Sequence, residues 1–199
     1  MFAWLSGEAG MDIGGWIVVA VVAVVLLWLI VIYNRLVRLR ALVKEGWSGI
    51  TVQLRRRADL IPNLVSTVEG YATHERDTLN EVTAHRTDPM KARGVEATAQ
   101  ADTAFSAMLG RLFAVAEDYP DLKADANFRQ LQDELAEVEE ELQGARRYYN
   151  ATVRDLNTQV QSFPDVLVAK PIGFSEEPFY ADEDPSIQAA PKVSFGARA

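Results

Sequence analysis

The hydrophobic pattern of the chain begins with one uninterrupted apolar run. From Ile13 to Tyr33 the sequence has no charged residue and nothing more polar than glycine and aromatic rings. A helix rises about 1.5 Å per residue, so the run spans about 30 Å, the thickness of a bilayer's hydrocarbon core. An α-helix also satisfies its own backbone hydrogen bonds in lipid. We therefore predict a transmembrane helix over residues 13–33; a buried core helix, the alternative, is rarely this long and apolar on all sides.

After Tyr33 the pattern changes to apolar positions that recur every three or four residues, as far as Val82. This spacing is typical of helices packed in a bundle or coiled coil. Pro62 lies inside the stripe, and a proline normally kinks or ends a helix. The stripe stays in phase across Pro62, without the run of glycine, aspartate or asparagine typical of loops. We favour one continuous, kinked helix; a hairpin turn at Pro62 is the alternative.

Two further helices follow in the same rhythm, over about residues 95–119 and 122–163. Asp88-Pro89 and Gly94 mark the loop before the first of them, and Pro120 and Pro164 end the two helices. Beyond residue 164, prolines and an acidic cluster argue against regular structure, while scattered apolar residues suggest that parts of this tail dock on the bundle. The predicted fold class is all-α: an N-terminal transmembrane helix continuing into a long-helix antiparallel (up-and-down) bundle, with an irregular C-terminal tail. The predicted segments are 1–12 (short extracytoplasmic N-terminus), 13–33 (membrane), 34–163 (cytoplasmic bundle) and 164–199 (acidic tail with Asp182, Glu183 and Asp184, partly docked).

Charge adds an orientation to this picture. The flank before the apolar run is acidic, with Glu8 and Asp12, whereas the flank after it carries Arg35, Arg38, Arg40 and Lys44. Basic flanks stay in the cytoplasm, so we expect the N-terminus outside and the C-terminal domain inside, in a single-pass protein of the bacterial cytoplasmic membrane. The acidic flank and long apolar run also differ from a cleavable signal peptide.

Composition excludes several function classes. The net charge is −8 and is negative in each of the segments 1–32, 33–163 and 164–199, so we expect no nucleic-acid partner. The chain has no cysteine, which removes disulfides, thiolate nucleophiles and cysteine-based metal sites.

The most unusual local sequence, QLRRRADLIPNLV, surrounds Pro62. Arg57 and Asp59 precede the proline by about one turn, and Asn63 follows it. Since proline lacks an N–H, it frees a carbonyl that Arg57 or Asn63 could recruit for a ligand. We favour the simpler alternative, in which these polar side chains satisfy the backbone groups that the kink exposes.

The two histidines do not form a recognisable metal-binding motif. His74-Glu75 has no partner at helical spacing, and Glu81–His85 is the one pair at i, i+4. A metal needs three or four ligands and no third histidine exists, so we predict no metal and no cofactor. Nucleophile triads and phosphate-binding glycine motifs are missing too, and we predict that the protein is not an enzyme. A membrane-tethered, metal-dependent hydrolase using His74, Glu75 and His85 is the alternative.

The dipeptide Tyr-Asn occurs twice, as Tyr33-Asn34 and Tyr149-Asn150. Buried asparagine and tyrosine side chains often fix the register between helices. We interpret Asn150 and Asn157 in that way.

These motifs together resemble the LemA family of bacterial membrane proteins, over about residues 33–195. The resemblance implies an N-terminal membrane helix and a cytoplasmic antiparallel helical bundle. It implies no catalytic residues, and it favours a docked or partner-binding tail. One departure is that Tyr-Phe is frequent in the family where this chain has Phe179-Tyr180. The motifs that carry the resemblance are LIPNLV (60–65), Gly70-Tyr71, His74-Glu75, Tyr149-Asn150, Phe163-Pro164, Gly173-Phe174, Pro178-Phe179 and PKVSF (191–195).

The sequence therefore predicts a membrane-anchored interaction or scaffold protein whose partners are the lipid bilayer and unidentified proteins. A self-assembling coiled coil, a homo-oligomer built from the long stripes, is a structural alternative. The candidate contact or motif residues are Arg57, Asp59, Pro62, Asn63, His74 and Glu75, then Tyr149 and Asn150, and in the tail Phe174, Phe179 and Tyr180.

Overall fold

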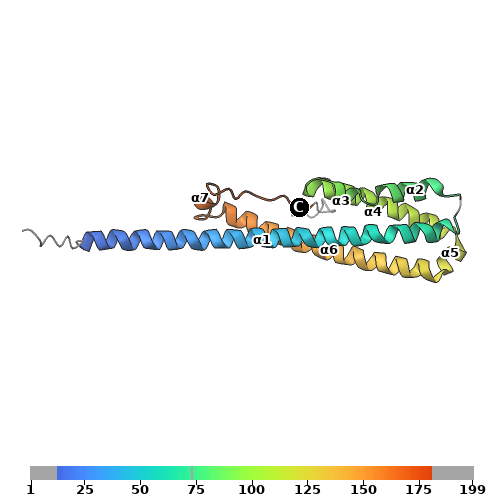
Figure 1. Ribbon diagram of the computed structural model, residues 1–199, viewed down its shortest axis with the longest axis horizontal. Helices are drawn as coiled ribbons and strands as arrows, with labels where there is room; N and C mark the ends of the chain where they lie inside the picture. Colours follow the sequence, from blue (N-terminus) through green and yellow to red (C-terminus); the bar gives the residue numbers. More distant parts are fainter. Residues whose placement is uncertain (1–12, 73, 181–199) are drawn as a thin grey trace, which may run out of the picture. The chain divides into compact units, whose positions relative to one another are not determined.

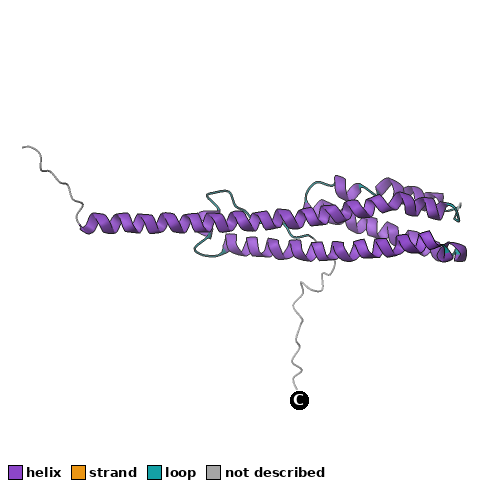
Figure 2. Cartoon of the chain, turned by 60° about the horizontal axis from the view of Figure 1, so that its bottom comes forward, coloured by secondary structure: helices purple, strands orange, loops and turns teal. Residues whose placement is uncertain are grey.

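A computed structural model of the protein describes residues 13–72 and 74–180. These residues form helices and no strand (Figures 1 and 2). The all-α prediction is therefore confirmed. The helices are α1 (Ile13–Glu69), α2 (Arg76–His85), α3 (Asp88–Lys91), α4 (Val95–Glu117), α5 (Pro120–Ala124), α6 (Ala126–Gln161) and α7 (Val166–Ala169).

The helix α1 runs without interruption through both Tyr33 and Pro62. A proline inside a helix removes one backbone hydrogen bond. Here the side chain of Pro62 is exposed, while Ile61 and Leu64 on either side of it are completely buried. Packing of these two side chains holds the helix across the proline, which confirms the continuous helix and excludes the hairpin at this position.

The helix α1 nevertheless ends earlier than the apolar stripe predicts. After Glu69 the amides of Tyr71 and Ala72 both hydrogen-bond to the carbonyl of Val68, at 3.0 and 2.8 Å. Gly70 lies in this turn, and the last stripe positions belong to the separate helix α2. The prediction of a single helix beyond residue 70 was wrong because glycine and the following turn outweigh the apolar period.

Two short helices, α3 and α7, occupy stretches that we predicted as irregular, and the helix predicted over 122–163 is divided into the short helix α5 and the long helix α6. Pro89 and Pro120 lie in the first turn of α3 and α5, where a proline's missing N–H has no helical partner to lose. Pro120 therefore starts a helix as well as ending the one before it. The helix α6 begins at Ala126, where the carboxylate of Asp125 accepts a 2.9 Å hydrogen bond from the amide of Phe128.

The chain divides into two compact units. One combines the chain up to Ala41 with Asp155–Glu176, and the other combines Leu42–Arg154 with the chain from Glu177 onward. Predictions for residues 1–12 and for the acidic and PKVSF segments of the tail lie outside the described residues.

In the unit that begins at Leu42, five helices contribute to one hydrophobic core. Phe105 of α4 and Phe128 of α6 are 1% exposed, and Leu122 of α5 is fully buried. This core stabilises the part of the bundle that carries the candidate site. Its buried members are Ile61, Leu64, Val68, Ala72, Leu79, Val82, Phe105, Leu109, Leu112, Ala116, Leu122, Phe128, Leu131 and Leu135.

In the other unit, the first part of α1 is apolar and largely uncovered. Val18, Val24 and Val31 are each more than 60% exposed. Of the described helices, α1 alone is long and apolar enough to cross a membrane. Exposed valines in a water-soluble protein would be unfavourable, so lipid is the solvent that suits this surface.

Candidate functional site

The centre of the candidate site is Asp102, an acidic residue on α4 that is 1% exposed. Its carboxylate accepts hydrogen bonds from Arg57 of α1, from Nη2 of Arg146 of α6 at 2.5 Å, and from the hydroxyl of Tyr180 at 2.7 Å. A buried carboxylate is tolerated only when charge and hydrogen-bond partners replace the water that it loses. Asp102 on α4 therefore connects α1, α6 and the tail through hydrogen bonds to one carboxylate.

Arg57 extends this network. Its Nη1 donates to the hydroxyl of Ser106 at 3.1 Å and to the carboxylate of Glu139 at 3.2 Å. Its guanidinium carbon lies 5.1 Å from the centre of the Phe105 ring, within range of a cation–π interaction. We call Arg57, Asp102, Glu139, Arg146 and Tyr180 the charged cluster. With two arginines and two carboxylates, its formal charges balance.

Burial and charge act in opposite directions on Arg146. Burial lowers the pKa of its guanidinium, but the charge of Asp102 and their hydrogen bond raise it more, so the net pKa is raised. Arg146 stays protonated at any physiological pH. Arg146 therefore contributes a constant positive charge to the cluster.

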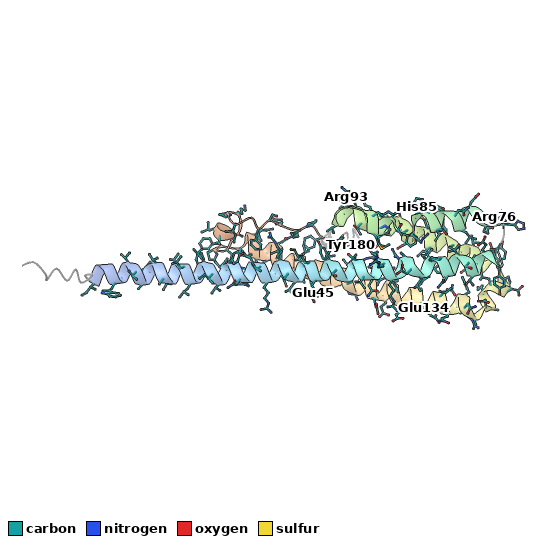
Figure 3. The ribbon with its side chains drawn as sticks, viewed as in Figure 1. Glu45, Arg76, His85, Arg93, Glu134 and Tyr180 are labelled. Atoms are coloured by element: carbon teal, nitrogen blue, oxygen red, sulfur yellow. The ribbon has the colours of Figure 1, made fainter. Side chains whose placement is uncertain are left out.

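The segment 177–180, which we call the tail strap, ends at Tyr180 of the charged cluster, which Figure 3 labels. The hydroxyl of Tyr149 donates to the carbonyl of Pro178 at 2.9 Å. The side chain of Asn150 accepts from the amide of Tyr180 at 2.8 Å and donates to its carbonyl at 3.1 Å. The ring of Trp47 lies against the rings of Tyr149 and Tyr180, with centroid distances of 5.7 and 6.4 Å. The Tyr149-Asn150 pair therefore holds an extended segment by its backbone.

Both tyrosines remain hydrogen-bond donors over a wide pH range. Burial, followed by the charge of Glu177, raises the pKa of Tyr149 to about 12. Burial, followed by the charge of Asp102, also raises the pKa of Tyr180. The hydroxyls that hold the strap keep their protons at neutral pH.

A groove with a volume of about 430 Å³ lies next to the charged cluster, between α4 and α6. Arg57 and Glu139 border it, and most of its remaining lining is apolar or small. We call it the α4–α6 groove. Its lining residues are Arg57, Ser106, Leu109, Gly110, Phe113, Gln132, Leu135, Ala136 and Glu139.

The polar residues around Pro62 do not gather into one site. Arg57 faces Asp102, whereas Asp59, Pro62 and Asn63 are exposed on α1. The carbonyl of Asn63 accepts the hydroxyl of Thr67 at 2.9 Å. The guanidinium of Arg57 is therefore committed to α4 and α6, and the idea that it recruits a ligand to a carbonyl freed by Pro62 has no geometric support.

The two histidines lie at opposite ends of α2, with His74 shortly before the helix and His85 as its last residue. His74 is exposed and Glu75 is the residue before the first turn, whereas His85 ends the helix; Figure 3 labels Arg76 and His85 near these two ends. Nδ1 of His85 lies 2.6 Å from the carboxylate of Asp88, and Glu81 pairs with Arg111 at 2.7 Å. Within residues 13–72 and 74–180 no three side chains are grouped as a metal would require.

Tail residues 174 and 179 differ from Tyr180 in their surroundings. Phe174 belongs to the unit that contains the apolar run of residues 13–33. It is 5% exposed and packs edge-on against Tyr33, with ring centres 6.5 Å apart. Phe179 belongs to the strap and is 48% exposed, while Tyr180 is 2% exposed. Of these three aromatics, Phe179 presents the largest free surface.

Sequence reasoning missed Asp102, Glu139 and Arg146. A signal for two of them existed: Asp102 stands four residues after the buried Thr98 and three before Phe105, in phase with the stripe of α4. Arg146 has the same relation to Leu142 and Tyr149 on α6. A charged residue in phase with a buried stripe needs a buried partner of opposite charge. Asn150 was assigned to helix register, but its side chain binds the backbone of Tyr180 instead, so that interpretation was wrong.

Known proteins are similar in sequence to this chain over most of its length. Residues 46–195 match the LemA family. The chain is 28% identical over 142 residues to Protein LemA of Metamycoplasma hominis, covering 69% of this chain and 63% of that protein. It is 24% identical over 177 residues to Magnetosome protein MamQ 2 of Paramagnetospirillum magneticum, covering 76% of this chain and 65% of that protein. The chain therefore spans slightly less than two thirds of the length of these relatives.

Proposed function

This chain belongs to the LemA family, and on that premise we propose that it is a membrane-anchored interaction or scaffold protein that binds a partner protein in the α4–α6 groove. The observation that supports this proposal is the contrast between the groove and the cluster beside it. In the charged cluster, the carboxylate of Asp102 is engaged by three donors from within the protein. The groove is an open, mainly apolar surface next to it. An apolar groove with charged groups at its border suits an amphipathic partner helix.

The closed network also argues for a constant shape at this surface. Arg57 links α1 to α4 and α6 through Asp102, Ser106 and Glu139. A groove whose walls are held in this way loses little conformational freedom when a partner binds, and so retains more of the binding free energy. We assign the buried polar residues a positioning role, and the groove the contact role.

The apolar run of α1 supports a location of this protein, and with it the proposed binding surface, at a bilayer. We propose the orientation that the flanking charges favour, with the acidic N-terminal flank outside and the bundle in the cytoplasm. The membrane is then the bacterial cytoplasmic membrane, and the partner is a cytoplasmic or membrane-bound protein.

Site-specific cross-linking in native membranes tests the groove. Gly110 lines it, is exposed, and a Cβ added there meets no atom within 4 Å. A photo-reactive amino acid at position 110 of the full chain should cross-link a distinct protein on illumination. Ala104 is the matched control, because it is exposed on α4 and, at about 100° per residue, lies on a different face.

The outcomes separate the alternatives. An adduct with another protein at position 110, absent at position 104 and lost in an Ala136→Glu variant, which places a charge at an exposed position of the groove, supports the proposal. An adduct with a second copy of this chain supports the self-assembling alternative instead. Equal adducts at both positions, or none at position 110, contradict a partner in the groove.

A further inference from the structure

The turn after α6 lies next to the point where α1 leaves the apolar run. We call residues 162–173 the α6–α7 corner; α6 ends at Gln161 and α7 is Val166–Ala169. Immediately after the corner, the ring of Phe174 contacts Tyr33, the last residue of the apolar run. The guanidinium of Arg40 lies 3.9 Å above the same ring and donates to the carbonyl of Gly173 at 3.0 Å. These contacts within one unit fix the corner at the level of the membrane–water boundary of a spanning α1.

The corner exposes large apolar side chains at this level. Phe163 is 80% exposed, Leu167 is 63% exposed and Ile172 is 42% exposed. Three such residues within ten positions give the corner a high density of exposed apolar side chains, for which water is an unfavourable solvent. The phenylalanine before Pro164 is as exposed as residues of the membrane run itself, such as Ile13.

The charges of the corner suit a phospholipid surface. Its acidic residue, Asp165, is 7% exposed and hydrogen-bonds to the side chain of Gln159. Lys170 is exposed, as are Arg35 and Arg38 on the part of α1 in the same unit. Apolar side chains next to exposed basic residues are typical of segments that lie in the interface of an anionic bilayer.

We propose that the α6–α7 corner is a second membrane contact, in which Phe163, Leu167 and Ile172 insert into the interfacial region of the leaflet from which α1 emerges. Lys170 then lies among the lipid headgroups. The continuity of the corner with the end of the apolar run, through the Phe174–Tyr33 contact, identifies lipid as its occupant. The anchor thus has two parts, a spanning helix and an inserted corner that limits the tilt of that helix. This inference rests on α1 spanning a bilayer and is independent of any partner in the α4–α6 groove.

Depth measurements on the full chain test the proposal. The protein has no cysteine, so a single cysteine at position 163, 167 or 172 gives one attachment point for a polarity-sensitive fluorophore. The labelled proteins are reconstituted in vesicles of phosphatidylethanolamine and phosphatidylglycerol, with and without nitroxide groups high on the acyl chains. Val52→Cys is the control, because Val52 is 57% exposed on α1 and lies 19 residues after Tyr33 in the sequence. Since all four side chains are exposed, the substitutions leave the core intact, and circular dichroism verifies the helices.

We expect blue-shifted emission and several-fold stronger nitroxide quenching at the three corner positions than at position 52. Quenching of the corner labels by aqueous iodide, at the level seen for position 52, would overturn the proposal. Protection from both quenchers would overturn it as well, since a protein surface, such as a second copy of the chain, would then cover the corner. A Lys170→Glu variant should reduce nitroxide quenching in vesicles with phosphatidylglycerol and leave it unchanged in purely zwitterionic vesicles.

Discussion

At the scale of single residues, Asp102 decides whether two buried arginines are tolerated. An Asp102→Ala substitution removes the buried carboxylate that both Arg57 and Arg146 contact, and leaves them with Glu139, whose side chain is partly exposed. Breaking a buried ion pair by removing one partner costs about 3–5 kcal/mol. We predict a loss of that size in the free energy of unfolding, measured by denaturant unfolding of the full chain in detergent.

The matched control for this prediction is Asp59→Ala. Asp59 belongs to the most distinctive sequence motif but is exposed on α1. Substitutions at such surface positions change stability by less than about 0.5 kcal/mol. Similar losses for the two variants would contradict the central role assigned to Asp102.

Sequence could identify one half of the charged cluster and not the other. Of its members, Arg57 and Tyr180 stand in motifs that the sequence singles out, as do Tyr149 and Asn150, which hold the strap beside it. Asp102 comes from a helix with an ordinary sequence, and its role depends on which face of α4 meets α1 and α6. Which helix faces pack together is decided by the tertiary structure. The sequence pattern of one helix can therefore indicate that a charged residue is buried, but not which residues are its partners.

At the scale of elements, the tail strap should detach at high pH. The strap depends on the protonated hydroxyl of Tyr149, whose pKa of about 12 exceeds the ordinary value of about 10. A raised pKa in the folded state means that this stabilisation is complete below pH 10 and is lost as the pH rises toward 12. We predict a free energy of unfolding that falls over this range, measured by denaturant titration at successive pH values.

A Tyr149→Phe variant separates the hydroxyl from the ring. It should lose about 1 kcal/mol at neutral pH, since the carbonyl of Pro178 loses its donor, and its stability should depend less on pH above 10. Tyr148→Phe is the control, because Tyr148 is the neighbouring residue on α6 and is 44% exposed. An unchanged pH profile for Tyr149→Phe would rule out this hydroxyl as the group that titrates.

The elements themselves were largely predictable. The long helices followed from the apolar period, and α4 begins at Val95 as expected. Errors arose where turn chemistry acts against that period: Gly70 ends α1 inside a continuing stripe, and Pro120 starts the short helix α5. A proline can terminate one helix and begin another, and which of these it does depends on the backbone before it. The strap is held by two side chains of α6 that hydrogen-bond to its backbone groups. Contacts of this kind produce no periodic pattern in the sequence.

At the scale of the whole molecule, one continuous helix contains both a segment suited to lipid and a segment that packs in the bundle. The helix α1 begins in the exposed apolar run, and from Leu36 onward it carries the buried stripe. Because no turn separates these parts, the bilayer determines where the packed part of α1 begins. The side of the membrane on which the bundle lies is then a property of the whole chain, set by the charges on the two flanks.

Cysteine labelling tests that orientation, because the chain has no cysteine of its own. Ser6→Cys places a thiol in the acidic N-terminal flank, and Ser66→Cys places one at an exposed position of α1 in the bundle. Four basic residues follow the apolar run within about three turns, and retaining them in the cytoplasm is the favoured outcome of insertion. We therefore predict that a membrane-impermeant maleimide labels Ser6→Cys in intact spheroplasts and labels Ser66→Cys only after the membrane is permeabilised. The opposite pattern would place the bundle outside the cell, and the α4–α6 groove would then face extracytoplasmic partners. Replacing Arg35, Arg38 and Arg40 with glutamine should weaken the bias, so that Ser66→Cys becomes labelled in a fraction of the molecules without permeabilisation.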